Sequence, residues 1–497
     1  MLTPSGRAAS LSSVTAAEGT ATEPARKTAV RPYNGAVTGK RFWIRTFGCQ
    51  MNEHDSERLA GLFSEQGMEP VGSADEADLV VFNTCCVREN ADNKFYGHLG
   101  DLKALKAAHP GLQIAVGGCM AQKDRGLIQE RAPHVDVVFG THNLAHAADL
   151  LERARLEGPV MEILEESEAF PSALPARRDV DHAAWVTIQI GCDNTCAFCI
   201  VPAVRGKEQS RRLGDIVREV TELAADGVTE VTLLGQNVNS YGRDLGAGQY
   251  KPRFADLLRA VDAVPGIRRI RYTSPHPKDL RPETIAAMAE CDAVCEHLHL
   301  PLQAGSDRTL ARMHRGYTAE RYLERLAAAR AAIPDLAVTT DLIVGFPGET
   351  EEDFAATLGV VEEAGYDAAY TFVFSPRPGT EAAAWVDEFV PPEVTADRMR
   401  RLTAVVERSA LARHEARVGR REEVLVEGPS KKDATMTTGR TRQNKLVHFR
   451  APGAGGLRPG AFAEVSVDSA APHFLRGTFL RRTADPARRV RIPVVAS

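Results

Sequence analysis

Short apolar segments alternate with longer amphipathic ones along the first third of the chain. Four apolar runs fit buried strands, at residues 41–47, 78–83, 112–116 and 135–139. Between them, apolar positions recur with the spacing of helices. Strands that alternate with helices in this way predict a parallel sheet, so we expect an α/β domain here.

A second series of strands and helices follows a Glu-, Pro- and Arg-rich connection near residues 165–181. Its predicted strands are 185–190, 229–234, 270–273, 297–300, 337–344 and 369–374. Six βα repeats are too few for a closed eight-stranded barrel. The pattern therefore predicts an open, partial (β/α)6 barrel with its active site at the carboxyl ends of the strands.

The pattern changes again after a helix near residues 392–416. Short strands separated by turn residues are predicted at 423–427, 434–438, 446–449, 463–467 and 475–480. This texture is typical of a small antiparallel β-barrel. The predicted division of the chain is a disordered tail at 1–39, an N-terminal α/β domain at 40–155, the partial barrel at 178–410 and the small barrel at 414–484.

The composition and charge of the chain predict its location in the cell and one candidate binding surface. The 497 residues have a formal net charge of −5, no apolar run long enough to span a membrane and no export signal, so we expect a cytoplasmic protein. An odd number of cysteines, nine, argues against a disulfide framework. Residues 413–450 carry a local balance of +5, which favours a surface that attracts phosphates over a merely solvated face.

The strongest chemical signal lies in the loop after the first strand of the partial barrel. Cys192, Cys196 and Cys199 stand there at spacing C-x3-C-x2-C. Three thiolates this close can hold three irons of a [4Fe–4S] cluster and leave the fourth iron open to a small molecule. An open coordination position marks a metal centre that does chemistry. Zinc is the alternative metal, but it would require a fourth Cys or His close by.

Three further cysteines each follow a predicted strand of the N-terminal domain. They are Cys49, Cys85 and Cys119, spaced about one βα unit apart. Because ligands gather beyond the carboxyl ends of parallel strands, we expect the three to share one rim and to hold a second three-thiolate cluster. Cys86 is ambiguous. Adjacent residues at a strand end point to opposite sides, so we assign Cys85 as the ligand.

Together these features resemble the radical S-adenosylmethionine (SAM) enzymes, and among them the methylthiotransferases. Aromatic Phe198 before the last cysteine of the loop is similar to the radical SAM signature, and the small barrel resembles the RNA-binding TRAM domain. The resemblance covers about residues 40–485. The stretches most similar to the tRNA branch, the MiaB type, are 46–52, 83–91, 234–242 and 273–277.

This resemblance implies a reaction and its cofactors. The enzyme would convert N6-isopentenyl (dimethylallyl) adenosine 37 of tRNA to its 2-methylthio derivative, using two [4Fe–4S] clusters and SAM. An unactivated aromatic C–H bond requires radical chemistry, which the cofactor must supply. By resemblance, the Cys192 loop would generate the radical from SAM, and the Cys49, Cys85 and Cys119 cluster would carry the sulfur. Phe198 would lie near the adenine of SAM, and Gly235 and Gln236 would contact its amino group.

The resemblance also implies partners. We expect the tRNA anticodon stem-loop, held at the barrel mouth by the TRAM domain, an electron donor such as flavodoxin or ferredoxin, and a monomeric enzyme. Arg205, Lys207, Arg211 and Arg212, just past the cluster loop, are candidate phosphate contacts.

Three alternatives to this function remain open. The same chemistry could act on a ribosomal protein or on threonylcarbamoyl-adenosine in tRNA, and an iron–sulfur protein could bind RNA without catalysis. Cys291 and Cys295 fit core positions of the barrel better than ligand positions.

Overall fold

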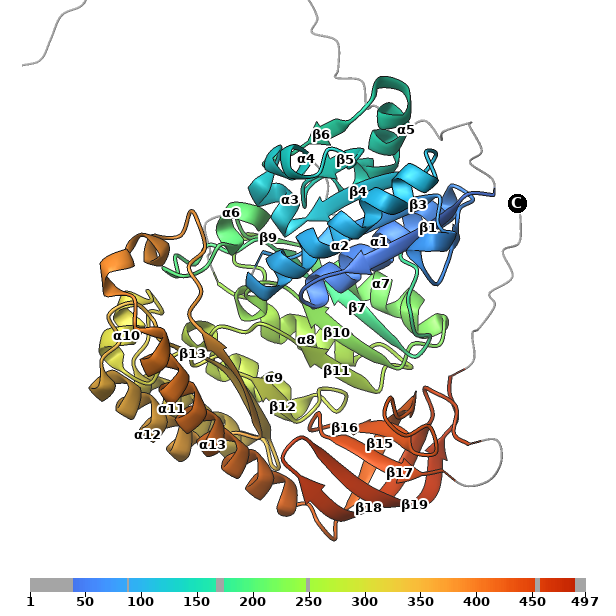
Figure 1. Ribbon diagram of the computed structural model, residues 1–497. Helices are drawn as coiled ribbons and strands as arrows, with labels where there is room; N and C mark the ends of the chain where they lie inside the picture. The colour runs from blue at the N-terminus through green and yellow to red at the C-terminus, as the bar shows by residue number, and fades with distance from the viewer. Residues whose placement is uncertain (1–38, 87–88, 167–173, 247–250, 452–455, 488–497) are drawn as a thin grey trace, which may run out of the picture.

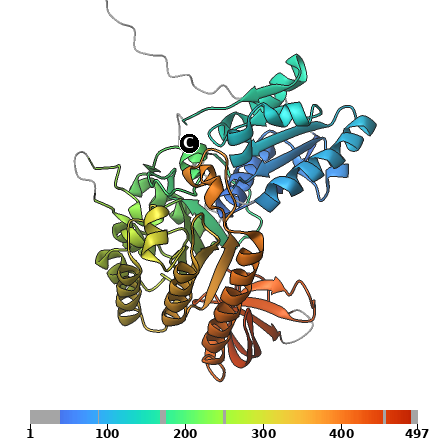
Figure 2. The same ribbon diagram turned by 60° about the vertical axis from the view of Figure 1, so that its left-hand side comes forward.

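The computed structural model describes residues 39–86, 89–166, 174–246, 251–451 and 456–487 (Figure 1). The predicted N-terminal tail lies outside this part of the chain except for Gly39. Three domains follow one another along the described chain, with the N-terminal sheet and the C-terminal barrel at opposite ends of the central domain (Figure 2).

The N-terminal domain is a six-stranded parallel sheet with strand order β2-β1-β3-β4-β5-β6. Its strands are β1 Arg41–Thr46, β2 Glu69–Pro70, β3 Leu79–Thr84, β4 Gln113–Gly118, β5 Val137–Phe139 and β6 Val160–Glu162. Its helices are α1 Gln50–Glu65, α2 Glu89–Ala108, α3 Cys119–Asp124, α4 Leu127–Arg131 and α5 Ala147–Glu157. The four predicted strands are confirmed. The two that the pattern missed, β2 and β6, are short edge strands with little apolar sequence to mark them.

The central domain contains the six predicted barrel strands in two halves. One half has the order β11-β10-β7 and the other β12-β13-β14, and a parallel bridge between Ile270 and Val294 joins them. Within the described residues β7 and β14 are edge strands, so the barrel is open as predicted. The strands are β7 Ala183–Thr187, β10 Glu230–Leu234, β11 Arg269–Tyr272, β12 His297–His299, β13 Ala337–Val344 and β14 Ala368–Val373.

Helices cover the outer face of the partial barrel and bury an extended apolar core against it. They are α7 Leu213–Ala225, α8 Phe254–Asp262, α9 Pro282–Glu290, α11 Ala319–Ala332, α12 Glu351–Ala364 and α13 Pro392–Glu415. Two more helices of this domain lie elsewhere: α6 Val201–Arg205 packs beside α3 of the N-terminal domain, and Leu310 of α10 Asp307–Arg312 belongs to a separate apolar cluster with Phe346. A small antiparallel ribbon, β8 Gln189–Ile190 with β9 Gln209–Ser210, lies beside the cysteine loop and was not predicted.

The C-terminal domain is a closed five-stranded barrel with order β15-β16-β17-β19-β18. Its strands are β15 Arg421–Pro429, β16 Thr437–Thr441, β17 Leu446–Arg450, β18 Phe462–Ala471 and β19 Phe474–Ala484. The prediction of an antiparallel barrel holds for every neighbouring pair except β17 and β19, which run parallel.

The barrel docks on the amino ends of the central strands, through residues that just precede β12, β13 and β14. Arg442 bonds Glu296 at 2.8 Å, Arg417 bonds Asp335 at 2.9 Å, and Lys445 bonds Asp367 at 2.6 Å. Active-site loops leave the opposite, carboxyl ends of the strands. We expected the C-terminal barrel to hold the substrate at the mouth of the partial barrel. That expectation is wrong, because the C-terminal barrel docks at the opposite ends of the strands.

The basic stretch 413–450 is largely committed to contacts within the chain. Besides the docking residues, Arg440 bonds Glu427 at 2.6 Å and Arg420 bonds Asp335 at 2.9 Å. Local charge balance therefore overstated the surface available for RNA phosphates. Lys431 and Lys432, in the turn before β16, are exposed.

Candidate iron–sulfur and SAM site

Cys49, Cys85 and Cys119 all lie at the carboxyl edge of the N-terminal sheet. Cys49 directly precedes α1, Cys85 follows β3, and Cys119 begins α3. Gly48 packs so closely on Cys85 that a Cβ at position 48 would overlap the Cys85 side chain. Cys49 lies within electrostatic range of Cys119. The strand-end argument therefore placed these three residues correctly, at one rim.

Two buried asparagines lock the loops that carry Cys49 and Cys85. The Asn52 side chain donates to the Thr84 carbonyl at 2.8 Å, and the Asn83 side chain donates to the Asn52 carbonyl at 2.7 Å. The Cys49 thiol lies 3.5 Å from the Asn52 side-chain oxygen. Asparagines of the two motifs therefore fix the spacing of the thiols before any metal binds.

Cys86 also contacts this site. Its thiol is fully buried and hydrogen-bonds Cys119, which lowers the pKa of Cys119 and raises that of Cys86. We expected Cys86 to point away from the rim, and that interpretation is wrong. Side-chain alternation applies within a strand, and β3 already ends at Thr84.

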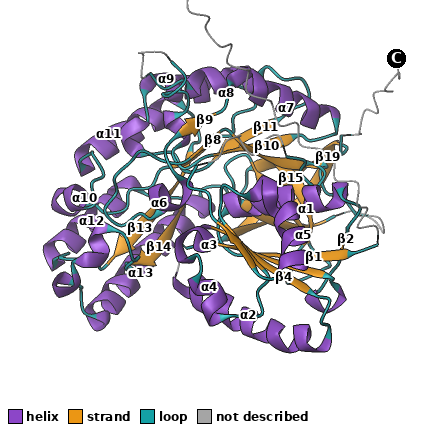
Figure 3. Ribbon diagram, turned by 90° about the horizontal axis from the view of Figure 1, so that it is seen from above, coloured by secondary structure: helices purple, strands orange, loops and turns teal. Residues whose placement is uncertain are grey.

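Arg205 lies between the two cysteine loops. It ends α6, the short helix that starts directly after the Cys192–Cys199 loop, and α6 packs beside α3 (Figure 3). Its guanidinium donates to the Asp55 carboxylate at 2.8 Å and hydrogen-bonds Cys119.

Two of the four candidate phosphate contacts are not available to RNA. Arg205 is buried in the contacts just described, and buried Arg211 donates to the Thr187 carbonyl at 2.8 Å and pairs with Glu219. Lys207 and Arg212 are exposed and remain candidates.

Backbone contacts and a buried arginine shape the Cys192–Cys199 loop. The Cys192 N–H donates to the Gly206 carbonyl at 3.1 Å, and the Cys199 N–H donates to the Cys196 carbonyl at 3.0 Å. Arg315, which sequence reasoning missed, donates to the Cys196 sulfur at 3.4 Å. Burial raises the pKa of Cys199 to about 12 and also raises that of Cys192. A bound metal centre would deprotonate such thiols, because metal coordination outweighs the cost of burying a thiolate.

Phe198 anchors the loop in an apolar cluster at the barrel mouth. Its ring packs edge-on against Phe346, which follows β13, with centroids 6.5 Å apart. The N–H of Ala197 donates to the Met313 carbonyl at 3.2 Å, and its carbonyl accepts from Ala382 at 2.9 Å. An aromatic wall of this kind suits a flat adenine ring.

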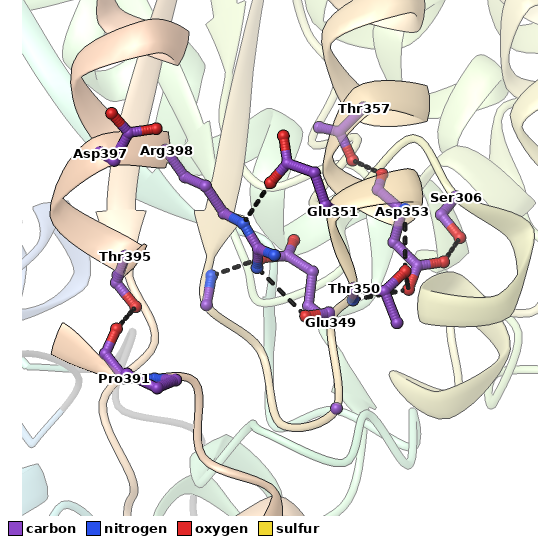
Figure 4. Close-up of polar contacts among 12 residues, drawn as sticks. Ser306, Glu349, Thr350, Glu351, Asp353, Thr357, Pro391, Thr395, Asp397 and Arg398 are labelled. Carbon is purple, nitrogen blue, oxygen red and sulfur yellow. Dashed lines mark hydrogen bonds and ion pairs between the residues drawn. The ribbon is translucent and has the colours of Figure 1, made fainter. Parts of the chain in front are cut away.

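A buried ion pair between Glu349 and Arg398 holds the loop after β13 against α13 (Figure 4). Arg398 of α13 bonds Glu349 at 3.0 Å, and Glu349 accepts from the Gly345 N–H at 2.8 Å. Asp353 caps α12 together with Thr350 and accepts from Ser306 at 2.5 Å. These contacts tie the loop after β12 to α12 and the loop after β13 to α13, on one side of the barrel mouth.

On the opposite side of the mouth, Gly235 and Gln236 follow β10 as predicted. The Gln236 Oε1 atom is buried and has no hydrogen-bond partner in the described structure. Buried acceptors without donors are rare and need a ligand or water. SAM offers N–H donors on its amino group, so this side of the mouth fits SAM.

The thiols within each cysteine set act on one another electrostatically: Cys192 and Cys196 on Cys199, and Cys119 on Cys49. Among the described residues, no three His, Cys, Asp or Glu side chains converge on the position of one metal ion. In a [4Fe–4S] cluster each thiolate binds a different iron, so the ligands surround a cluster rather than a single ion. Cys291 and Cys295, by contrast, are buried beside the barrel core, as expected.

Three known families match successive parts of the chain. They are the uncharacterized protein family UPF0004 at residues 41–140, the radical SAM superfamily at 186–361, and the TRAM domain at 415–480. Each match falls inside one of the predicted domains, whose boundaries stay predictions.

Curated relatives match most of the chain and share one name. The tRNA-2-methylthio-N(6)-dimethylallyladenosine synthase of Acidothermus cellulolyticus is 57% identical over 440 residues, which cover 88% of this chain and 87% of the relative. The synthase of Nocardioides sp. is 54% identical, with 88% of both chains covered. That of Mycobacterium marinum, numbered 1, is 52% identical, covering 91% of this chain and 89% of the relative.

A solved structure supports the arrangement of the fold. The radical SAM methyltransferase TsrM from Kitasatospora setae, with cobalamin and a [4Fe-4S] cluster bound, superposes with a TM-score of 0.51. The match covers 69% of this chain and 77% of TsrM at 14% identity, so it bears on the fold alone.

Proposed function

We infer that this chain is a tRNA methylthiotransferase, because it belongs to the tRNA-2-methylthio-N(6)-dimethylallyladenosine synthases of the radical SAM superfamily. The reaction converts N6-dimethylallyladenosine in tRNA to its 2-methylthio derivative, and we place it at position 37, beside the anticodon. Its cofactors are SAM and [4Fe–4S] clusters, two per chain. When bound, these cofactors supply the radical chemistry that an unactivated aromatic C–H bond requires.

The residues of this chain divide into two metal sites in our proposal. Cys192, Cys196 and Cys199 hold the cluster that binds SAM. Cys49, Cys85 and Cys119 hold the auxiliary cluster, which serves sulfur transfer. In both sets the protein fixes the loops through backbone and side-chain hydrogen bonds, which pre-organises the ligands.

SAM itself is positioned by the mouth of the partial barrel. Phe198 and Phe346 exclude water on the side of the adenine ring, and Gly235 lies at the end of β10 beside Gln236. Gln236 accepts hydrogen bonds from the amino group of SAM. Arg315 neutralises part of the thiolate charge at Cys196.

The observation that carries the proposal is the direct link between the two sets. A single short helix, α6, starts directly after the SAM loop and ends at Arg205, which contacts both Cys119 and Asp55. This connection supports two metal sites that work on one substrate.

The partners follow from the same arrangement. We propose that the anticodon stem-loop enters the mouth and that exposed Lys207 and Arg212 contact its phosphates. We also propose that the enzyme works as a monomer in the cytoplasm, with flavodoxin or ferredoxin as the electron donor. None of the helices described here is long and apolar enough to cross a membrane.

Nucleoside mass spectrometry tests this function. tRNA from cells that lack the gene should accumulate N6-dimethylallyladenosine, and the wild-type gene should restore the 2-methylthio product. A gene with Cys192→Ala, which produces a similar amount of protein, should not restore it. Unchanged 2-methylthio-nucleoside in the deletion strain would contradict the proposed function.

A further inference from the structure

Cys86 adds a fourth thiol to the rim that carries Cys49, Cys85 and Cys119. It donates a hydrogen bond to the sulfur of Cys119. Cys86 is fully buried and Cys119 is 6% exposed, and both belong to one apolar cluster with residues of β3, β4 and α2. Cys85 packs against Gly48 instead. Cys86 and Cys119 are therefore a contacting pair of thiols, although only Cys119 is a proposed cluster ligand.

The backbone holds this pair at the ends of two neighbouring strands. Thr84 and Gly118 are partners in the last register pair of β3 and β4. The two chains approach so closely here that a Cβ added to Gly118 would lie 2.5 Å from the Thr84 carbonyl oxygen. Cys119 follows Gly118 directly, and Cys86 lies two residues past Thr84. Neighbouring strands are about 4.8 Å apart, and a disulfide requires Cα atoms roughly 4.4–6.8 Å apart, so this arrangement suits an S–S bond.

Cys119 lacks protection from oxidation whenever the proposed auxiliary cluster is incomplete. Hydroperoxides oxidise an uncovered thiolate to sulfenic acid and then to sulfinic acid, which thiol reductants do not reverse. A sulfenic acid beside a second thiol condenses to a disulfide instead, and thiols reduce that bond again. Cys86 stands beside Cys119 in the position that such a second thiol requires.

We propose that Cys86 and Cys119 form a reversible disulfide when the auxiliary cluster is absent. Hydrogen peroxide oxidises the Cys119 thiol to sulfenic acid and is itself reduced to water. The Cys86 sulfur then attacks the Cys119 sulfur, the S–S bond forms, and the hydroxyl group leaves as water with the proton of Cys86. A thiol reductant restores both thiols. This inference rests on the proposed function for the ligand role of Cys119, and it gives Cys86 a role other than ligation.

Peptide mapping tests the disulfide directly. The full chain is reduced, stripped of iron by a chelator under anaerobic conditions, treated with equimolar hydrogen peroxide and alkylated. Trypsin releases Cys119 on peptide 107–123, and Cys85 together with Cys86 on peptide 59–88. Mass spectrometry of the wild type should find these two peptides joined, and a thiol reductant should separate them. Peptides that stay unlinked in the oxidised wild type would overturn the inference.

Two matched variants identify the partner of Cys119. Cys85→Ser removes the adjacent thiol and should keep the link between the two peptides, whereas Cys86→Ser should abolish it. Serine retains a hydrogen-bond donor beside Cys119, and the melting temperatures of the metal-free proteins check that both variants fold. A link that persists in Cys86→Ser, or that is lost in Cys85→Ser, would overturn the assignment of Cys86.

Over-oxidation of Cys119 measures the consequence of the disulfide. With excess peroxide, peptide 107–123 of Cys86→Ser should carry sulfinic acid at Cys119, located by fragmentation of the peptide. The same peptide from the wild type and from Cys85→Ser should be recovered largely as the free thiol after reduction. Equal sulfinic acid in the wild type and in Cys86→Ser would contradict a protective role.

Iron content before the chelator treatment separates this inference from the proposed function. A reconstituted wild type with no more than about four irons per chain, but with the Cys86-dependent link intact, would contradict the proposed auxiliary cluster alone. About eight irons together with an absent link would contradict the disulfide alone.

Discussion

The guanidinium of Arg205 donates to the carboxylate of Asp55 at 2.8 Å, across the boundary between the central and N-terminal domains. Both side chains are buried, with 7% and 3% of their surface exposed. The same guanidinium hydrogen-bonds Cys119. One buried cation thus joins the helix after the Cys192–Cys199 loop to Cys119 of the N-terminal domain.

Removal of this cation should destabilise the interface between the two domains. Arg205→Leu leaves the buried Asp55 carboxylate without its hydrogen-bonded cation, and breaking a buried pair in this way typically costs about 3–5 kcal/mol. Denaturant unfolding of the metal-free protein measures the change. Arg212→Leu, at an exposed position in the next segment, should shift the free energy of unfolding by no more than about 0.5 kcal/mol. Equal effects of the two variants would contradict a structural role for the pair.

Separate substitutions of the adjacent residues Cys85 and Cys86 should show which of the two is a ligand of the proposed auxiliary cluster. Cys85→Ala should still form 5′-deoxyadenosine from SAM but make no methylthio product, because only the auxiliary cluster is lost. Cys86→Ser keeps a hydrogen-bond donor beside Cys119 and should retain methylthio transfer. Both products are measured by mass spectrometry in one reaction. The reverse pattern, with Cys86→Ser inactive and Cys85→Ala active, would show that Cys86 is the ligand.

Ionisation of Glu57 in α1 should make the folded chain less stable as the pH rises. Burial, together with the charge of Asp179, raises the pKa of Glu57 to about 7 from an ordinary 4.5. Between these values the folded chain binds a proton that the unfolded chain has released, so rising pH favours unfolding, and the cost is complete above about 7. Glu57→Gln removes this cost. It should be about 2 kcal/mol more stable than wild type at pH 8 and equal to it near pH 4.

Urea unfolding curves at the two pH values provide that comparison. Glu65→Gln, at the end of the same helix, is the control and should change neither curve by more than about 0.5 kcal/mol. A wild type that matches Glu57→Gln at pH 8 would contradict the raised pKa.

Binding of tRNA should depend on the exposed lysines of the C-terminal barrel rather than on its docked arginines. Replacement of Lys431 and Lys432 by alanine should weaken tRNA binding and reduce the slope of log K against log salt by about 1 to 2. The double variant Arg218→Ala, Arg400→Ala removes the same charge from arginines that pair with carboxylates in their own helices. It should retain the wild-type slope. Equal slopes for the two double variants would argue against a lysine contact.

Local sequence patterns predicted most of the fold and the positions of the six cysteines. Apolar runs mark β3 and β13 because these strands are largely buried, and the spacing around Cys192 suffices for a three-thiolate loop. Edge strands such as β2 have no comparable apolar signal. The motif asparagines were visible in the sequence, but their role in fixing the Cys49 and Cys85 loops needed the structure.

Contacts between distant segments were beyond reach of the sequence. Arg315 reaches Cys196 from a loop more than a hundred residues away, and Arg205 reaches Asp55 across the boundary between two domains. Arg442 looked like part of an RNA surface because its partner, Glu296, lies in another domain. Charge counted along a segment cannot reveal such pairing, and strand alternation does not extend to Cys86, past the end of β3.

Iron and sulfide content after anaerobic reconstitution tests the central claim, two clusters held by separate domains of one chain. We predict about eight irons per wild-type chain. A variant with Cys49, Cys85 and Cys119 replaced by alanine should hold about four, and a variant with Cys192, Cys196 and Cys199 replaced should also hold about four. About four irons in the wild type, or an unchanged content in either variant, would contradict the account.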